Sequence, residues 1–406
     1  MLYHEHLLAN GIRLIHIAAT GRVAHAALMV HTGSRDETSE IQGMAHFLEH
    51  VFFKGTTHRK AYHINNRLDE VGGELNAYTA KEETCIHASF LSEYFPRAIE
   101  LMADIFFHST FPEKELEKEK EVILDEINSY LDNPSEQIAD DFEELVFPNH
   151  PLGYKILGTP EIIQNFTRDQ VIRFVQENYY TDEMVLVTMG DFPLYRIVRL
   201  FEKYFSDQPA RLNKPEREAF NAYRPQYSEQ QKDSYQTHCM LGREAYSVNH
   251  PLRLPMYVLS NYLGGPGMNS RLNMVLREKH GLAYHVEMNY APYSDTGLLT
   301  LYFGTENGNL KKALRLIERE LKRLSAQPLT AVQLEKAKKQ LIGQLALANE
   351  SPINQVLSMA KSYLVFGRCD SLEEVNAKIL GVTLEQIEQV SREIFDFETL
   401  SQLIYR

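Results

Sequence analysis

Hydrophobic and polar positions along this 406-residue chain follow strand-like and helix-like periods, in an order that the two halves share. The first half predicts a strand at 23–31, a short helix that ends at Gly55, a helix from His58, a hairpin, helices at 92–108 and 112–132, and a strand at 184–189. The second half predicts a strand at 235–241, helices at 252–262 and 269–280, a hairpin at 283–305, helices that begin near 309 and 330, and a strand at 399–405. The shared order of elements, without strong residue identity, predicts a duplicated architecture.

The halves are separated by 206–231, a segment rich in proline, charge and amide side chains, which is typical of a linker. A chain of 406 residues is also too long for one ordinary hydrophobic core. We therefore expect a first domain at 1–206, a linker at 207–231 and a second, homologous domain at 232–406. Hairpins and long helices without regular βαβ alternation predict the class α+β, with helices packed on a largely antiparallel sheet in each domain.

The short helix before Gly55 carries the most informative motif, His46-Phe47-Leu48-Glu49-His50. His46 and His50 stand four residues apart, so both imidazoles project from one helical face and can reach one ion. Neutral imidazole suits zinc, and Glu49 beside them can take a proton from water on the metal. The order H-x-x-E-H is the inverzincin motif. The alternative is a helix with two incidental histidines.

A third ligand is best sought in the charged helix at 112–132. Ile123, Ile127 and Leu131 mark its buried stripe, and Glu126 flanks that stripe. Glu119 lies two turns earlier on nearly the same face. One of these carboxylates can bind the metal while the other orients a ligating histidine. The alternative is that these glutamates, which alternate with Lys118 and Lys120, form a solvated face.

Composition narrows the classes of function and location. The formal net charge of −13 and the lack of a recognised basic cluster argue against a nucleic-acid partner and permit attraction of basic peptides. Apolar runs stay shorter than a membrane span, and the first residues lack the features of a signal peptide, so we expect a cytoplasmic protein without membrane association. Three scattered cysteines, Cys85, Cys239 and Cys369, are expected to be buried thiols in a reducing compartment.

With His46-x-x-Glu49-His50 followed by Glu119 and Glu126, the chain resembles the pitrilysin/insulinase family of zinc metallopeptidases, and within it the short-chain subgroup similar to processing peptidases. The resemblance implies one Zn²⁺ per chain, held by His46, His50 and Glu126. It implies that Glu49 is the general base and that Glu119 supports the site. The domain at 1–206 would then be the zinc-binding catalytic domain.

Two further segments are similar to family motifs. The run Gly72 to Thr79 alternates into a strand, and by resemblance its Asn76, Ala77, Tyr78 and Thr79 bind the substrate backbone at a sheet edge. Without the resemblance it would be an ordinary hairpin with a polar turn. The glycine-rich run from Gly264 to Leu272, then Arg277 and Tyr284, is similar to the family's second-domain loop and Arg/Tyr pair, which would hold the substrate and stabilise its oxyanion. The glycines alone would indicate only a flexible turn.

Together these features predict a zinc-dependent endopeptidase that hydrolyses short, unfolded peptides inside a chamber enclosed by a homodimer. In this family, subunits that lack the zinc motif or the Arg/Tyr pair are inactive alone, and this chain keeps both sets. A non-catalytic assembly or scaffold subunit of a related heterodimer is the main alternative. A metal-dependent hydrolase of a non-peptide substrate is the other, and the strand that contains Asn76 argues against it.

Overall fold

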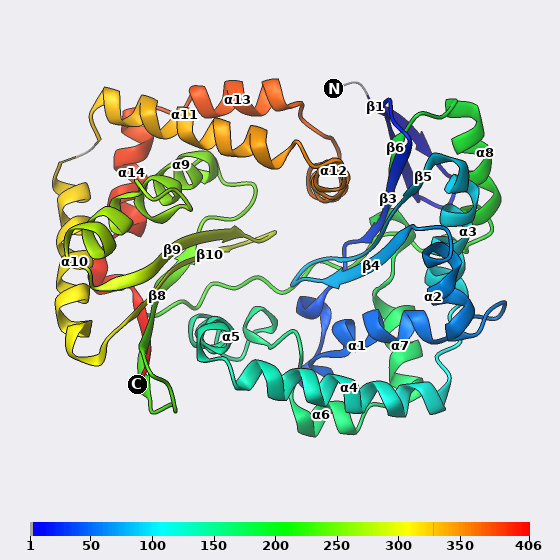
Figure 1. Ribbon diagram of the computed structural model, residues 1–406, viewed down its shortest axis with the longest axis horizontal. Coiled ribbons are helices and arrows are strands. Elements are labelled where there is room, and N and C mark those ends of the chain that lie inside the picture. The colour runs from blue at the N-terminus through cyan, green and yellow to red at the C-terminus, as the bar shows by residue number, and fades with distance from the viewer. Residues whose placement is uncertain (1–2, 328) are drawn as a thin grey trace. The chain divides into compact units, whose positions relative to one another are not determined.

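The computed structural model describes residues 3–327 and 329–406, which form two compact units (Figure 1). The first unit comprises the described residues up to Asn128 together with Tyr154–Arg217 and Leu347–Ser371. The second comprises Ser129–Gly153, Glu218–Ala346 and Leu372–Arg406. Each unit contains one sheet and its own hydrophobic core, so each is described by itself.

The sheet of the first unit has the strand order β1-β2-β6-β3-β5-β4. β2 and β6 run parallel, and the other neighbours run antiparallel. β4 is an edge strand, whereas every residue of the central β6 is buried because both faces of the sheet are covered. The bounds are β1 (Tyr3–Leu7), β2 (Arg13–Ala18), β3 (Val23–Val30), β4 (Glu74–Thr79), β5 (Thr84–Leu91) and β6 (Met184–Gly190).

The sheet of the second unit repeats this pairing, with the order β7-β11-β8-β10-β9. Its β7 and β11 run parallel like β2 and β6, and its remaining pairs are antiparallel like those from β6 to β4. The duplicated α+β architecture is therefore confirmed, and β1 has no counterpart among the described strands. The bounds are β7 (Tyr227–Gln230), β8 (Thr237–Ala245), β9 (Ala283–Pro292), β10 (Gly297–Thr305) and β11 (Ser401–Tyr405).

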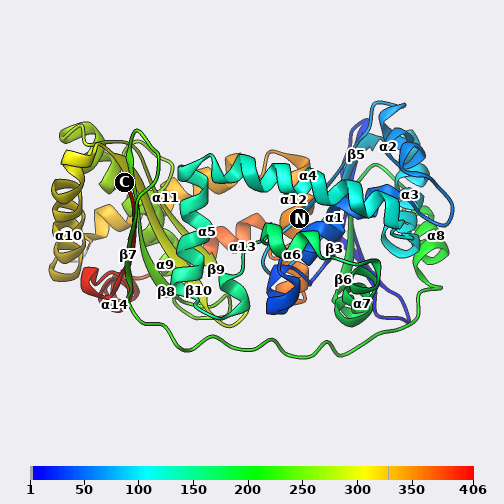
Figure 2. The same ribbon diagram turned by 90° about the horizontal axis from the view of Figure 1, so that it is seen from below.

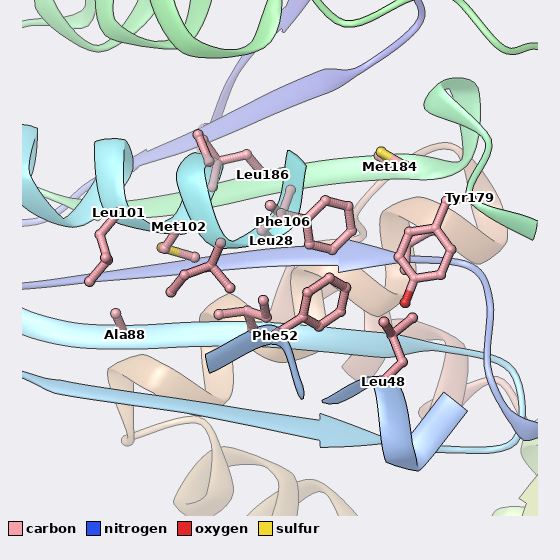
Figure 3. Close-up of a cluster of buried hydrophobic side chains, with 14 of the residues drawn as sticks. Leu28, Leu48, Phe52, Ala88, Leu101, Met102, Phe106, Tyr179, Met184 and Leu186 are labelled. Carbon is pink, nitrogen blue, oxygen red and sulfur yellow. The ribbon is translucent and has the colours of Figure 1, made fainter. Parts of the chain in front are cut away.

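Helices of the first unit bury one face of its sheet. Figure 3 shows Leu28 and Leu186 from the strands beside Phe106 and Phe52, whose rings stack with centroids 5.6 Å apart. This core fixes the helix that carries the histidine motif, since Leu48 of the same segment is fully buried there. The bounds are α1 (Met44–Val51), α2 (Ala61–Asp69), α3 (Phe95–His108), α4 (Glu113–Leu131), whose last residues lie in the second unit, α6 (Pro160–Gln164), α7 (Arg168–Asn178) and α8 (Leu194–Phe205).

The opposite face of the first sheet is covered by α12 (Pro352–Phe366), a helix from the second half of the sequence. Its Val356, Ala360 and Tyr363 pack on the strands, and its Lys361 pairs with Glu83 at 2.5 Å. Conversely, α5 (Pro134–Val146), from the first half, packs on β8 and β11 of the second unit (Figure 2). The compact units therefore depart from the expected contiguous domains at 1–206 and 232–406, because each two-faced sheet takes one covering helix from the other half.

The remaining helices of the second unit are α9 (Arg253–Gly264), α10 (Leu310–Ala326), α11 (Ala331–Ala348), whose last residues lie in the first unit, α13 (Leu372–Leu380) and α14 (Leu384–Ile394). The helix expected at 269–280 is π-helical over Asn273–Lys279. β1, β2 and β7 were not expected. β2 is buried along Leu14 to Ile17, so its sequence lacks the alternation that indicates a strand. Within the described part of the chain, no helix combines the length and apolar character that crossing a membrane requires.

Candidate metal centre

The histidine motif lies on α1, whose first turn is fixed by Glu37. Gly43 precedes the helix with φ +92°, a conformation that favours glycine. The buried Glu37 carboxylate accepts hydrogen bonds from the N–H groups of Gly43 (2.8 Å) and Ala45 (2.7 Å). Burial raises the pKa of Glu37 to about 8, although these two hydrogen bonds favour the anion and so lower the pKa. The first turn of α1, with His46 next to Ala45, is therefore held from outside the helix.

His46, His50 and Glu126 converge on one point within the first unit. Glu126 Oε1 lies 3.9 Å from His46 Nε2, and Glu126 Oε2 lies 3.6 Å from His50 Nε2. Ligand atoms of all three residues lie within 4.8 Å of one another. Tetrahedral zinc with bonds of 2.0–2.1 Å would place its ligand atoms about 3.3 Å apart. The observed separations are slightly wider and too long for hydrogen bonds, so the donor set fits a zinc ion.

The protonation state of His46 suits a ligand. Burial and the charge of His50 lower the pKa of His46 to about 4, so its imidazole is neutral at physiological pH. Its buried Nδ1 has no hydrogen-bond partner among the described residues. Glu126 has a side chain that is 45% exposed, so this carboxylate approaches the histidines from the solvent side. Two imidazole nitrogens and one carboxylate oxygen are a donor combination that catalytic zinc sites use.

Glu119 lies behind His50. One of its carboxylate oxygens is 3.2 Å from His50 Nδ1, and the other is 2.7 Å from Lys54 Nζ. Burial raises the pKa of Glu119, but the hydrogen bonds from His50 and Lys54 outweigh this effect and hold the pKa below its usual value. The anion therefore accepts the Nδ1 proton of His50, which leaves the lone pair of Nε2 free for a metal on the side where Glu126 lies.

Glu49 sits beside this set and is held by Thr79. The hydroxyl of Thr79 donates to Glu49 Oε2 at 2.7 Å. Burial raises the pKa of Glu49, and the Thr79 hydrogen bond opposes that shift. A carboxylate with a raised pKa next to a metal ligand is suited to accept a proton and later return it.

The four residues expected to bind substrate lie on β4 but have different surroundings. Asn76 is exposed, and Ala77 is half-buried against the core of the first unit. Tyr78 packs against the cluster under α12, with its ring centroid 6.4 Å from that of His87. Thr79 points to Glu49. Only Asn76 therefore has the exposed side chain at the edge strand that direct substrate contact requires.

Arg277 and Tyr284 lie in the second unit, near each other. The Arg277 guanidinium carbon is 4.9 Å from the centre of the Tyr284 ring, and Tyr284 is 80% exposed. The glycine-rich run before them is held in place, since Arg271 bonds to the buried Glu320 at 2.7 Å. Asn269 further bonds to Gln340 of α11. These side-chain contacts hold the run in one conformation, so it is not simply a flexible turn.

Sequence reasoning missed three contributions to the site, those of Glu37, Lys54 and the Thr79 hydroxyl. Lys54 follows His50 by four residues, so helical spacing could have indicated that it lies near His50, although not that it pairs with Glu119. Glu37 and Thr79 reach α1 from separate segments, and no pattern along the chain indicates their contacts.

The three thiols are free, with Cys85 and Cys239 buried and Cys369 only half-buried.

Two protein-family models and several curated proteins match this chain. The family model described as "Insulinase (Peptidase family M16)" matches residues 14–160, and the model "Peptidase M16 inactive domain" matches residues 165–341. The chain is 36% identical over 392 residues to an uncharacterized zinc protease of Bacillus subtilis, covering 95% of this chain and 94% of that protein. It is also 36% identical over 379 residues to an uncharacterized zinc protease of Rickettsia bellii, covering 93% and 91%.

Solved structures share the fold. A protease from Helicobacter pylori superposes with a TM-score of 0.90 at 21% identity, covering 100% of this chain and 99% of that one. A peptidase M16 inactive domain from Pseudomonas fluorescens gives 0.88 at 19% identity, covering 100% and 98%. The expected family is confirmed by the matched models and the zinc proteases among the relatives. The chain belongs to the insulinase family of peptidases, peptidase family M16.

Proposed function

We propose that this protein is a zinc-dependent endopeptidase that hydrolyses short, unfolded peptides. The observation that carries the proposal is the convergence of His46, His50 and Glu126 at separations that fit zinc, with Glu49 beside them. Its relatives from Bacillus subtilis and Rickettsia bellii are named zinc proteases. The position of β4 at the edge of its sheet further supports a peptide substrate, because backbone pairing accepts varied sequences.

Each residue has a distinct chemical task in this proposal. When bound, zinc would lower the pKa of a water molecule and polarise the scissile carbonyl. His46, His50 and Glu126 would hold the metal, and Glu119 would fix the tautomer of His50. Glu49 would take a proton from the attacking water and return it to the leaving amine.

In this proposal Arg277 and Tyr284 would bind the substrate and not the metal. A guanidinium and a phenol hydroxyl can donate hydrogen bonds to the substrate backbone and to the developing oxyanion. They would do so when the second unit, of this chain or of a partner copy, closes over the zinc. We further propose that the active form is a homodimer that encloses the peptide, and that the net charge of −13 favours basic peptides.

A non-catalytic scaffold subunit is the competing function, suggested by the description of one matched model as an inactive domain. That model covers residues 165–341, whereas all five residues of the candidate centre lie within residues 14–160. Retention of the complete set of His46, Glu49, His50, Glu119 and Glu126 therefore favours the enzyme.

Hydrolysis of an internally quenched, basic fluorogenic peptide tests the proposal. We expect turnover that a chelator abolishes and one equivalent of zinc restores, from a species with the mass of a dimer in size-exclusion chromatography with light scattering. Zinc-loaded protein that cleaves no peptide would overturn the enzymatic assignment, and unchanged activity after metal removal would overturn the metal mechanism. A monomeric active species would overturn the dimer alone.

A further inference from the structure

Thr79 is the last residue of β4, and strand pairing fixes its place. Its partner across the hairpin is Thr84, the first residue of β5. The turn between them is closed by a 2.8 Å hydrogen bond from Ala80 N–H to the Glu83 carbonyl. The position of Thr79 is therefore set by a paired hairpin end. A side chain on such a rigid element can hold a partner precisely.

The hydroxyl of Thr79 points from this hairpin to α1. Its 2.7 Å contact to Glu49 Oε2 is the shorter of two, since the Ala45 carbonyl oxygen lies at 3.4 Å. A hydroxyl has one proton to donate, so the short contact to the carboxylate is its main hydrogen bond. The structure gives no hydrogen bond to Glu49 Oε1 from any described side chain or backbone group. One oxygen of the base is thus fixed and the other is left for water.

We infer that Thr79 is a positioning residue, which holds the Glu49 carboxylate so that its second oxygen faces the attacking water. This inference rests on the proposed function. It differs from the expectation that Thr79 binds substrate, because here the residue acts through Glu49. It also links the edge strand that would pair with a peptide directly to the base that would activate water.

Two substitutions separate the hydroxyl from the rest of the side chain. Thr79→Val keeps the shape and the strand preference but removes the donor. Thr79→Ser keeps the donor and removes a methyl group. We expect Thr79→Val to lower kcat by about 100-fold with KM nearly unchanged, since small misplacement of a reacting group has effects of this size. Thr79→Ser should stay within a few-fold of the wild type, and both variants should keep their zinc content and Tm.

A binding measurement provides a readout that does not depend on peptide hydrolysis. Acetohydroxamate chelates zinc through two oxygens and can share its proton with a neighbouring carboxylate, so its affinity reports where Glu49 sits. Titration calorimetry on zinc-loaded protein is suitable, because the chain contains no tryptophan for fluorescence. We expect Thr79→Val to weaken binding about 10-fold and Thr79→Ser to leave it unchanged, in line with other groups that orient a metal site.

The outcomes are distinct. An increase in KM at constant kcat would overturn the inference in favour of direct substrate binding. Equal losses in the Val and Ser variants would overturn it in favour of packing, and wild-type behaviour of Thr79→Val in both assays would remove the residue from the mechanism. If the wild type binds acetohydroxamate but cleaves no peptide, the proposed function fails while the hydroxamate affinities still decide the role of Thr79.

Discussion

Replacing Glu119 by glutamine should weaken zinc binding without abolishing it. The Glu119 side chain is only 7% exposed and lies between His50 Nδ1, 3.2 Å away, and Lys54 Nζ, 2.7 Å away. Glutamine has nearly the same size, but it carries no charge and its amide nitrogen cannot accept a proton from either donor. His50 therefore loses the anion that fixes its tautomer, while all three ligands of the metal remain.

The size of the effect follows from the role of Glu119. Losing a carboxylate that orients a ligating histidine costs about 10- to 100-fold in metal affinity, or about 1.4–2.8 kcal/mol. Glu126→Gln removes a ligand and should cost more. The zinc dissociation constant, measured by competition with a chromophoric chelator, tests both variants. Glu121→Gln is the matched control, because this glutamate of α4 is exposed and forms no ion pair within the described residues.

Two results would refute this reasoning. If Glu119→Gln removes zinc altogether while Glu126→Gln binds it normally, the roles of the two carboxylates are reversed. If Glu119→Gln binds zinc as tightly as the Glu121→Gln control, the hydrogen bond to His50 has no effect on the metal site.

Three further predictions follow from other contacts. Glu49→Gln should keep its zinc and lose turnover by at least about 10²–10⁴-fold, since the amide cannot accept a proton; peptide cleavage near the wild-type rate would contradict this. Tyr284→Phe should keep zinc content and Tm but lose about 10²–10³-fold in kcat/KM, and unchanged kinetics would remove the phenol from the mechanism. Despite burial, Arg217 and Lys214 lower the pKa of Asp36 to about 2. Asp36→Asn should therefore cost about 2 kcal/mol or more of unfolding free energy at neutral pH. A depressed pKa stabilises the fold fully above the unfolded value near 4 and progressively less down to the folded value near 2, so in urea unfolding experiments the difference between the variant and the wild type should shrink over this pH range. A constant difference would be contrary evidence.

Much of the candidate metal centre could be predicted from local sequence, because its residues are arranged by helical spacing. The four-residue spacing of His46 and His50 places both rings on one face of α1, and their centroids lie 4.7 Å apart. The seven-residue spacing of Glu119 and Glu126 likewise places both carboxylates toward the histidines. Distances of this kind depend on the helix and little on its surroundings. Which glutamate faces the metal required the resemblance to the family.

The hydrophobic pattern of the sequence does not predict which helices cover the two sheets. α5 and α12 are ordinary helices with one apolar side, and nothing in their periodicity indicates which sheet they cover. The π-helical turn that carries Arg277 was likewise missed, since hydrophobic spacing does not separate it from an α-helix over so short a run.

The sequence by itself therefore determined most of the helices, the order of elements and the placement of the candidate metal-binding side chains on shared helical faces, because these depend on spacing along one element. Only the tertiary structure decided that Glu37 holds the first turn of α1, that Lys54 pairs with Glu119 and that Thr79 reaches Glu49. Two of these contacts join residues 30 or more positions apart in the chain, and all three depend on side chains brought together by core packing. Such contacts are set by the burial of the whole first unit, which local periodicity does not encode.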